Sequence, residues 1–444
     1  MTSGMPPFLL VIAAAISLSP AGCAHPPAAQ QGSADTHHTR VIELANGRWF
    51  TGTGFEPRKM YMVDGVFAAR VDRAPDSVID LAGGFVVPPF GEAHNHNVDA
   101  STPAAGRTLV QKYLGEGVFY AQNPANVLRA KNGLAGLINV PTGLDATFSN
   151  AVLTAPGGHP MGLFLRNLGR GAMLPTDSNS TEGFLWTITD KRDLENKWPR
   201  ILASHPDFIK ALLLYSEEYE KRKSDTAFFN WRGLDPKLLP EIVQRAHAAG
   251  LRVMTHVETA ADFHNSLVAG VDEIGHLPGF RGNERQQLPT LVPYVISDDD
   301  AKLAAQRGTI VITTVGGVAP LSPVGPDSLI RRGVDSIART NLRTLKRRGV
   351  RIAIGSDSYR TTSVPEALYI HALGVFSKAE LLRAWTEQTA RAIFPRRAIG
   401  RLEPGYEASL LVLDGDPTVD FDNVTHIRLR IKQGEIIPSR ALTP

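Results

Sequence analysis

Two histidines one residue apart, His94 and His96, have the spacing that most directly suggests chemistry in this sequence. They follow a short apolar run of strand type, Phe85 to Val87, and a pair of prolines. Side chains at positions i and i+2 of an extended backbone point to the same side. The two imidazoles could therefore hold one metal ion, although two polar loop histidines are the simpler interpretation of this pattern taken alone.

Four residues further along the chain could complete a metal site, because each lies at or near the end of a candidate strand. They are Lys210, His256, His276 and Asp357. Imidazole and carboxylate ligands suit Zn²⁺ and similar divalent ions, and two ions about 4 Å apart can share a hydroxide whose pKa falls towards neutrality. Asp357 could bind one ion, take the proton from the attacking water and later pass it to the leaving group.

Lys210 interrupts an apolar strand, which is a costly position for an amine unless the side chain is paired or modified. A carbamylated lysine would carry an anionic head whose two oxygens could bridge both ions. Taken singly, each of the four residues has a structural alternative: a lysine reaching the surface, two core histidines, and an aspartate that caps a turn. Their shared position at candidate strand ends favours one common site.

Other polar residues give weaker signals. Arg281 follows the strand that ends at His276 and could hold a substrate carboxylate through two hydrogen bonds, but a solvated loop arginine fits equally well. His159, His264 and His371 have no partner in this scheme, and we interpret them as structural.

The elements that must position these residues alternate between strand-like and helix-like segments from His94 onward. Amphipathic stretches at 236–250, after Asp235 as N-cap, and from Asp335 as N-cap to Gly349 are expected helices. The pattern predicts an α/β protein whose residues 88–398 form a TIM-like (β/α)8 barrel, with 141–200 as a long loop insertion over the site. Candidate strands end near Tyr120, Val140, Leu214, His256, His276, Thr314 and Asp357.

Short strand-like runs separated by Gly and Asp-Gly turns fill residues 39–87, and strand-like runs return in residues 399–444. Because both ends of a domain's chain are often adjacent in space, we expect these two segments to form one small β-sandwich domain.

The N-terminal segment has the features of an export signal. Residues 8–18 are apolar and too short to span a bilayer comfortably. Residues 19–23 resemble a bacterial lipoprotein cleavage site, which predicts a signal at 1–23, lipidation of Cys23, and a flexible tether at 24–38. Pro20 departs from that pattern, so a secretory signal cleaved nearby is the alternative. We expect export to the periplasm or attachment to a bacterial membrane.

Composition excludes some partners. The formal net charge is +3, 20% of residues are charged and 43% are hydrophobic, which is ordinary for a globular protein. We find no long basic stripe with interleaved aromatics, so nucleic-acid binding is not indicated.

Several motifs together resemble the amidohydrolase superfamily in its binuclear form, in the branch of imidazolonepropionase-like and prolidase-like enzymes. They are VVPPFGEAHNH at 86–96, FIK at 208–210, His256 with His276 twenty residues later, IGSD at 354–357, IGRLEPG at 399–405 and LVLDGDP at 411–417. The resemblance covers about residues 40–437. Pro89, Gly91, Glu92 and Ser409 depart from the usual residues of these motifs.

The resemblance implies a TIM-like barrel with two divalent metal ions, for which Zn²⁺ is expected. It implies His94, His96, Lys210, His256, His276 and Asp357 as metal ligands, with Lys210 carboxylated and Asp357 catalytic. Related dipeptidases use a tyrosine near the lysine strand to polarise the scissile carbonyl, so Tyr215 or Tyr219 is a candidate for that role.

We therefore expect an exported binuclear hydrolase that cleaves an amide C–N bond of a small dipeptide-like or acyl-amino-acid substrate with a metal-bridging hydroxide. Hydrolysis of a lactone, ester or cyclic amide is an alternative on the same site. A mononuclear deaminase, with Glu258 as the acid/base, and a non-catalytic metal-binding lipoprotein are further alternatives, against which Lys210 and Asp357 argue. The sequence leaves a homo-oligomer open.

Overall fold

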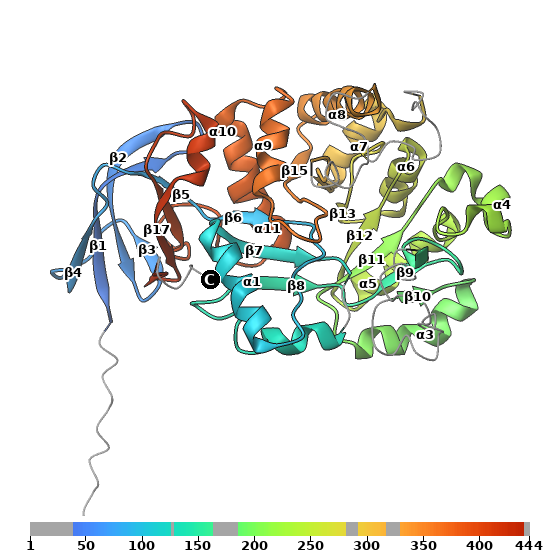
Figure 1. The fold of residues 1–444 in the computed structure, drawn as a ribbon, viewed down its shortest axis with the longest axis horizontal. Coiled ribbons are helices and arrows are strands. Elements are labelled where there is room, and N and C mark those ends of the chain that lie inside the picture. Colours follow the sequence, from blue (N-terminus) through green and yellow to red (C-terminus); the bar gives the residue numbers. More distant parts are fainter. Residues whose placement is uncertain (1–38, 126–127, 163–184, 281–291, 317–328, 439–444) are drawn as a thin grey trace, which may run out of the picture. The chain divides into compact units, whose positions relative to one another are not determined.

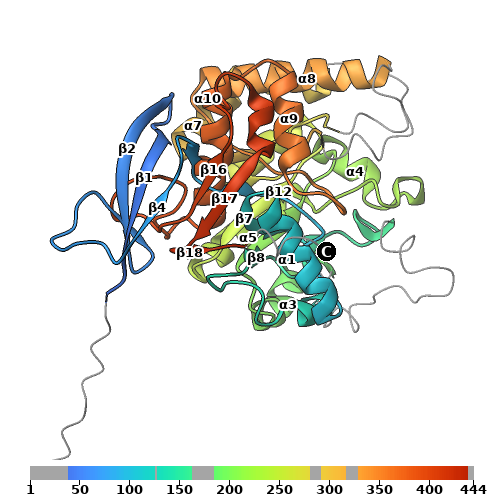
Figure 2. The same ribbon diagram turned by 60° about the vertical axis from the view of Figure 1, so that its left-hand side comes forward.

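A mixed sheet of eight strands joins the first and last parts of the chain that the computed structural model describes, which are residues 39–125, 128–162, 185–280, 292–316 and 329–438. The order is β18-β17-β16-β5-β1-β2-β3, with β4 beside β1. The blue and red strands are neighbours in Figures 1 and 2. They are β1 (Val41–Phe50), β2 (Phe55–Val63), β3 (Val66–Ala68), β4 (Ser77–Asp80), β5 (Phe85–Val87), β16 (Leu410–Leu413), β17 (Ile427–Lys432) and β18 (Glu435–Ile436). The expected union of both chain segments in one β unit is confirmed, as one mixed sheet.

Two tight turns of this sheet meet. Asp64-Gly65 joins β2 to β3 with φ of 46° and 79°, and Gln433-Gly434 joins β17 to β18 with φ of 52° and 81°. Positive φ at both central residues is typical of a type I′ turn, whose twist matches the twist of the antiparallel strands that it joins. A Cβ on Gly65 would lie 2.8 Å from the carbonyl oxygen of Gln433, so the contact between the turns also requires glycine.

Parallel strands form the second unit, a TIM-like barrel with helices on both sides of the strands in Figure 1. One sheet has the order β6-β7-β8 and the other β10-β9-β11-β12-β13-β14-β15. The strands are β6 (Phe90–Glu92), β7 (Val118–Asn123), β8 (Asp145–Phe148), β9 (Val152–Thr154), β10 (Leu185–Thr187), β11 (Phe208–Leu212), β12 (Arg252–His256), β13 (Glu273–Ile274), β14 (Ile310–Ile312) and β15 (Arg351–Ala353).

Hydrogen bonds close the circle between the two parallel sheets. On one side, the Ala93 N–H donates to the Ile354 carbonyl at 2.9 Å, just beyond β6 and β15. On the other side, the Asp207 N–H donates to the Phe148 carbonyl at 2.8 Å, between β8 and β11. β8 and β9 act as two halves of one strand, since β8 pairs with β7 and β9 pairs with β11. β10 pairs with β9 at the edge of its sheet and lies outside this circle, so the barrel has eight strand positions, as the sequence predicts.

The prediction that residues 141–200 form only a loop insertion is wrong. This segment contains β8, β9, β10 and helix α3 (Lys191–Ala203), and the strand expected to end near Val140 is instead a turn. The third barrel strand is broken at Asn150, where φ is 62°. Each half is therefore only three or four residues long and is flanked by Gly, Pro and Asn, which hides the strand signal.

Helices connect the barrel strands and cover them. The helix expected at 236–250 is confirmed, with the Asp235 side chain accepting from the Lys237 N–H. Asp335 is not an N-cap as predicted, because α8 already begins at Leu329 and Asp335 forms an ion pair with Arg331 one turn earlier. Within the described ranges, no helix is both long and apolar enough to cross a membrane.

The α-helices, besides α3, are α1 (Pro103–Gly115), α4 (Tyr219–Arg222), α5 (Leu239–Ala248), α6 (Ala260–Ala269), α7 (Asp298–Arg307), α8 (Leu329–Arg347), α9 (Val364–Ala372), α10 (Lys378–Arg383) and α11 (Thr389–Ile393), and η8 (Ala384–Gln388) is a π-helical turn. Short 3₁₀ segments are η1 (Leu128–Leu134), η3 (Ser216–Glu218), η4 (Thr226–Phe228), η5 (Pro236–Leu238), η6 (Val292–Tyr294) and η9 (Phe421–Thr425).

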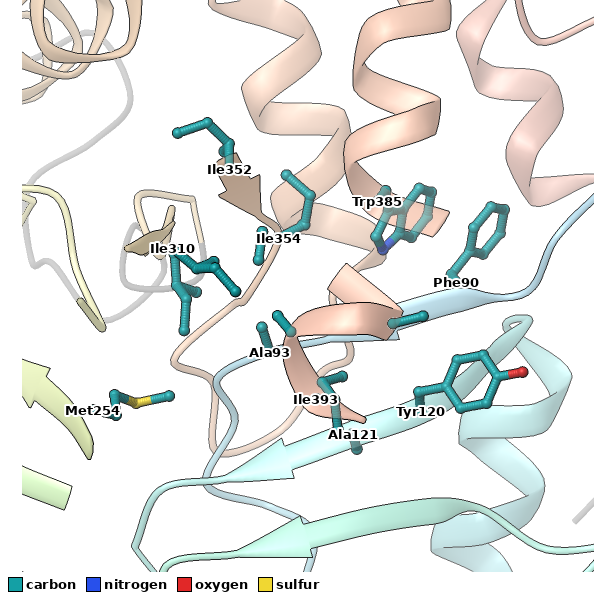
Figure 3. Packing of buried hydrophobic residues seen from close by; sticks show 14 of the residues in the cluster. Phe90, Ala93, Tyr120, Ala121, Met254, Ile310, Ile352, Ile354, Trp385 and Ile393 are labelled. Atoms are coloured by element: carbon teal, nitrogen blue, oxygen red, sulfur yellow. The ribbon is translucent and has the colours of Figure 1, made fainter. Parts of the chain in front are cut away.

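The first barrel strand is fixed by the π-helical turn and α11. The rings of Phe90 and Trp385 stack with centroids 3.7 Å apart, and Figure 3 shows the two rings side by side. The Trp385 indole N–H donates to the Gly91 carbonyl at 3.0 Å. A Cβ on Gly91 would lie 2.5 Å from Cγ2 of Thr389, so this departure from the family motif lets α11 approach β6 closely. The residues that precede His94 are thereby held against a buried apolar layer.

Candidate metal centre

The six predicted ligands lie on five strands, at or near the carboxyl ends. His94 and His96 follow β6, and His256 is the last residue of β12. Lys210 is the third residue of β11, and its side chain is buried. His276 lies two residues beyond β13, and Asp357 lies four residues beyond β15. Residues from opposite parts of the sequence therefore meet at one end of the barrel, where enzymes of this architecture carry their active sites.

His94, His96 and Asp357 form one cluster. Oδ1 of Asp357 lies 3.0 Å from Nε2 of His96 and 3.6 Å from Nε2 of His94. One ligand atom from each of the three residues lies within 4.8 Å of the others, which is the spacing of donors around a single ion.

The remaining three residues surround this cluster. The His276 ring centroid lies 4.5 Å from that of His94 and 4.3 Å from that of His256. Gly275 leaves room for the Lys210 side chain, since a Cβ there would lie 2.7 Å from Nζ of Lys210 and 3.0 Å from Cε1 of His94. The geometry thus brings all six predicted residues together.

Burial decides the charge states at the centre. Burial, followed by the positive charge of Lys210, holds the pKa of His94 well below its usual value, so the imidazole is neutral and can donate a lone pair. Burial lowers the pKa of Lys210 to about 7, against the attraction of Asp357 and Glu273. A substantial fraction of this lysine is therefore a neutral amine near neutral pH.

Glu92 positions the ends of two strands. Its carboxyl oxygens accept from the backbone N–H groups of His94 at 3.1 Å and Ser356 at 2.9 Å, and from the Ser356 hydroxyl at 2.7 Å. Burial raises the pKa of Glu92 to about 8. This side chain therefore ties the segment that carries His94 to the segment that carries Asp357.

Neighbouring side chains orient the other histidines. The Nδ1 atom of His276 lies 2.7 Å from the Thr314 hydroxyl, just beyond β14, and Nε2 of His256 lies 3.1 Å from Oε1 of Glu258. Such contacts fix the ring orientation of metal-binding histidines. Nδ1 of His94 is buried and has no hydrogen-bond partner among the described residues. Imidazole nitrogens beside the Asp357 carboxylate are a donor set that suits divalent ions.

Comparison with known proteins agrees with this site. The model of the amidohydrolase family matches residues 218–437, which include His256, His276 and Asp357. Residues 218–437 therefore belong to the amidohydrolase superfamily. As in other proteins of this superfamily, the His/His/Asp group marks a metal-dependent hydrolase. No curated protein sequence matches this amidohydrolase significantly.

Solved structures share the whole fold at low sequence identity. A prolidase in complex with N-methylphosphonate-L-proline is 19% identical, with a TM-score of 0.67 over 89% of this chain and 99% of that one. A Xaa-Pro dipeptidase with bound methionine is 16% identical, with a TM-score of 0.67 over 89% and 99%. The ochratoxinase of A. niger is 17% identical, with a TM-score of 0.68 over 90% and 95%.

The substrate-binding candidates of this amidohydrolase differ in their positions. Tyr215 is buried beyond β11 in a left-handed conformation (φ 50°), and its N–H donates to Asp262 at 3.0 Å. Burial and then Glu258, the neighbour of His256, raise the pKa of Tyr215. Tyr219 lies in α4 and is partly exposed, with Lys223 Nζ 5.8 Å from its ring centre. Arg281 lies outside the described residues.

Sequence reasoning missed His159. It was interpreted as structural, but it lies just beyond β9, is buried, and its ring centroid is 5.1 Å from that of His256. It was missed because its strand was missed, so its place at a strand end went unrecognised. His264 lies beside Asp300 and His371 lies beside Phe421, so neither contacts the predicted ligands.

Two aromatic rings also adjoin the centre. Phe280 stacks on His276 with centroids 4.1 Å apart, and Tyr359 stacks on His96 at 5.1 Å. Phe280 is buried whereas Tyr359 is 47% exposed, so Tyr359 is accessible to solvent beside a predicted ligand. The sequence could have indicated both aromatic residues, because Phe280 follows the predicted ligand His276 by four residues and Tyr359 follows Asp357 by two.

Proposed function

We propose that this amidohydrolase hydrolyses the C–N bond of a dipeptide-like substrate. The observation that carries the proposal is the convergence of His94, His96 and Asp357 with Lys210 and the two strand-end histidines. The kinship of the fold to a prolidase that binds a proline phosphonate and to a Xaa-Pro dipeptidase favours a dipeptide over other amides.

Each residue has a role in the proposed reaction. Divalent ions bound here, with Zn²⁺ expected, would supply Lewis acidity at the scissile carbonyl and lower the pKa of an attacking water. Asp357, whose side chain is 15% exposed, accepts the proton of that water and returns it to the leaving nitrogen. Lys210 is carboxylated in this proposal, which its lowered pKa supports because the neutral amine is the nucleophile that adds CO₂.

The second group of residues would bind substrate. His159 and Tyr215 lie on the side of the centre that carries His256 and Glu258, where they could donate hydrogen bonds to a carbonyl or carboxylate. Tyr359 would contact an apolar part of the substrate beside His96.

The test is metal analysis of the purified protein together with a screen of Xaa-Pro dipeptides and N-acyl amino acids. Wild type should hold about two equivalents of metal, and Lys210→Ala should fall towards one with loss of turnover. His264→Ala, a surface histidine outside the site, should retain both. Full metal content and unchanged turnover in Lys210→Ala would contradict the proposal.

One observation favours a second candidate, a deaminase with a single ion. Glu258 lies 3.1 Å from Nε2 of His256, where it could act as acid and base. In that case wild type would hold about one equivalent of metal, and Lys210→Ala would retain activity while Glu258→Gln would lose it.

We also propose export, with Cys23 as a lipidated N-terminus. The apolar residues 8–18 and the small residues before Cys23 support this placement. Expressed in a bacterium, the wild type should partition into detergent, whereas Cys23→Ala should remain in the aqueous phase. Mass spectrometry of the mature N-terminus distinguishes lipidation from a plain secretory cleavage.

A further inference from the structure

A cavity of about 500 Å³ lies at the amino-terminal ends of the barrel strands, opposite the metal centre. It opens where β12 and β15 begin and where α6 and α7 end. Val271 and Ile310 contribute apolar surface to its wall. Its most frequent polar lining residue is arginine, contributed by Arg252, Arg307, Arg351 and Arg391.

Two of these arginines have no carboxylate partner among the described residues. Arg307 donates to the carbonyls of Leu267 and Val268 at the end of α6, and Arg351 donates to the carbonyl of Gly308 at the end of α7. Each contact uses one terminal nitrogen, while a guanidinium carries five N–H donors. Capping of helix ends therefore accounts for only part of the donor capacity of Arg307 and Arg351.

The remaining charges do not neutralise the cavity. Arg252 is paired with the buried Glu273. Asp272 also lines the wall, but it accepts from His247 Nε2 at 2.9 Å and from a backbone N–H. Arg391 lies 3.5 Å from Glu387, and that carboxylate also pairs with two other arginines. Positive charge is therefore in excess around this space.

We propose that this cavity binds a small polyanion that carries phosphoryl groups. The planar guanidinium fork matches phosphate oxygens with two parallel hydrogen bonds, and Arg307 at the end of α7 and Arg351 at the start of β15 can offer such forks. The volume is in the range of ligand-binding pockets. This site is separate from the hydrolytic centre, so it stands whichever bond that centre cleaves.

The experiment is isothermal titration of the full-length protein with inorganic tripolyphosphate at low salt, with citrate as the carboxylate comparator. The double variant R307Q/R351Q should weaken tripolyphosphate binding by about tenfold or more, because hydrogen bonds to charged groups are lost. The control R192Q removes an exposed arginine of α3 and should bind like wild type. Glutamine retains one donor for the helix-end carbonyl, and circular dichroism verifies the fold.

A second arm identifies the source of the phosphate. Flotation with phosphatidylglycerol vesicles, using a C23A background, should show no association if the ligand is a soluble phosphate. Vesicle association that is lost in R307Q/R351Q would assign a lipid headgroup to the same cavity. No saturable tripolyphosphate or vesicle binding, equal binding of citrate, or equal weakening by R192Q would overturn the proposal.

Discussion

At the scale of single residues, the centre depends on side chains that are not themselves ligands. Glu92 is fully buried and accepts hydrogen bonds from two different strand ends. Asp262 has a comparable role on the other side of the barrel, where it accepts from the N–H groups of Tyr215, Ser216, Glu258 and Thr259. Two buried carboxyl groups thus fix the loops on which the proposed chemistry depends.

The first prediction concerns Glu92. Glu92→Ala should lower the free energy of unfolding by about 3 kcal/mol, because several buried donors lose their acceptor. It should also lower metal content, since His94 and Asp357 are no longer tied together. Glu92→Gln keeps one acceptor oxygen and should lose less on both measures. Urea unfolding and metal analysis check this, and equal behaviour of the two variants would contradict it.

The six candidate ligands were predictable because their types are rare at the ends of apolar runs and each run is regular enough to recognise. Glu258 was visible as a neighbour of His256, and it lies where that spacing suggests. The contact between His159 and His256 was not predictable, because it depends on a strand pairing that local sequence does not encode. The role of Glu92 was hidden for the same reason, since its partner Ser356 is 264 residues away.

At the scale of elements, the close approach of α11 to β6 determines where the first histidines lie. Gly91 faces Thr389, and the Thr389 hydroxyl accepts from the Ile354 N–H at 2.9 Å. One threonine thereby contacts the first strand through its methyl group and the last barrel strand segment through its hydroxyl.

The second prediction tests this contact. Gly91→Ala should cost about 1–3 kcal/mol, because the added Cβ would lie 2.5 Å from the Thr389 methyl group. Thr389→Ser removes that methyl group and keeps the hydroxyl. In the Thr389→Ser background, Gly91→Ala should therefore cost much less. A double-mutant cycle by chemical denaturation measures the coupling, and additive costs would show that the methyl group is not the obstacle.

Strands and helices differed in how well the sequence predicted them. Helix α5 was predictable because an aspartate cap and a terminal glycine bracket an amphipathic run. The start of α8 was not, because Asp335 resembles a cap while its carboxylate pairs within the helix and with Tyr369. β8 and β9 were missed because tertiary pairing with β7 and β11 stabilises them despite unfavourable flanks.

At the scale of the whole molecule, a buried ionic network joins the mixed sheet to the barrel. Lys432 of β17 is fully buried, and its Nζ lies 2.8 Å from Asp145 of β8. Arg397 lies 2.7 Å from the other oxygen of Asp145 and also pairs with Glu407, which hydrogen-bonds to Ser409. Ser409, a departure from the family motif, thus contributes to this junction.

The third prediction follows from that burial. Lys432→Met should lower the free energy of unfolding by about 3 kcal/mol, because it leaves part of a buried negative charge uncompensated. The exposed Lys346–Glu380 pair is the matched control, and Lys346→Met should cost less than about 1 kcal/mol. Thermal and urea unfolding give both values. Similar costs for the two lysines would contradict a structural role for the network.

The fourth prediction concerns metal removal. The proposed ligands come from five strands, so bound ions would stabilise the folded state by linkage, about 4 kcal/mol at a thousandfold excess over Kd. Chelation should therefore lower the melting temperature of wild type in calorimetry. Asp357→Asn should show a smaller chelator-dependent shift, and His264→Ala the full one. An unchanged melting temperature in wild type after verified metal loss would contradict this view.

The segment between β5 and β6 has a practical consequence. Val87 pairs with Leu411 in the sheet, Phe90 begins the barrel, and only the buried prolines 88 and 89 separate them. Proline fixes φ, so this crossing offers little slack. A chain trimmed before Leu410 would remove β16, one of the two neighbours of β5, within about eight residues of His94. We therefore expect such a truncated barrel to lose its metals instead of yielding a minimal, independently working enzyme.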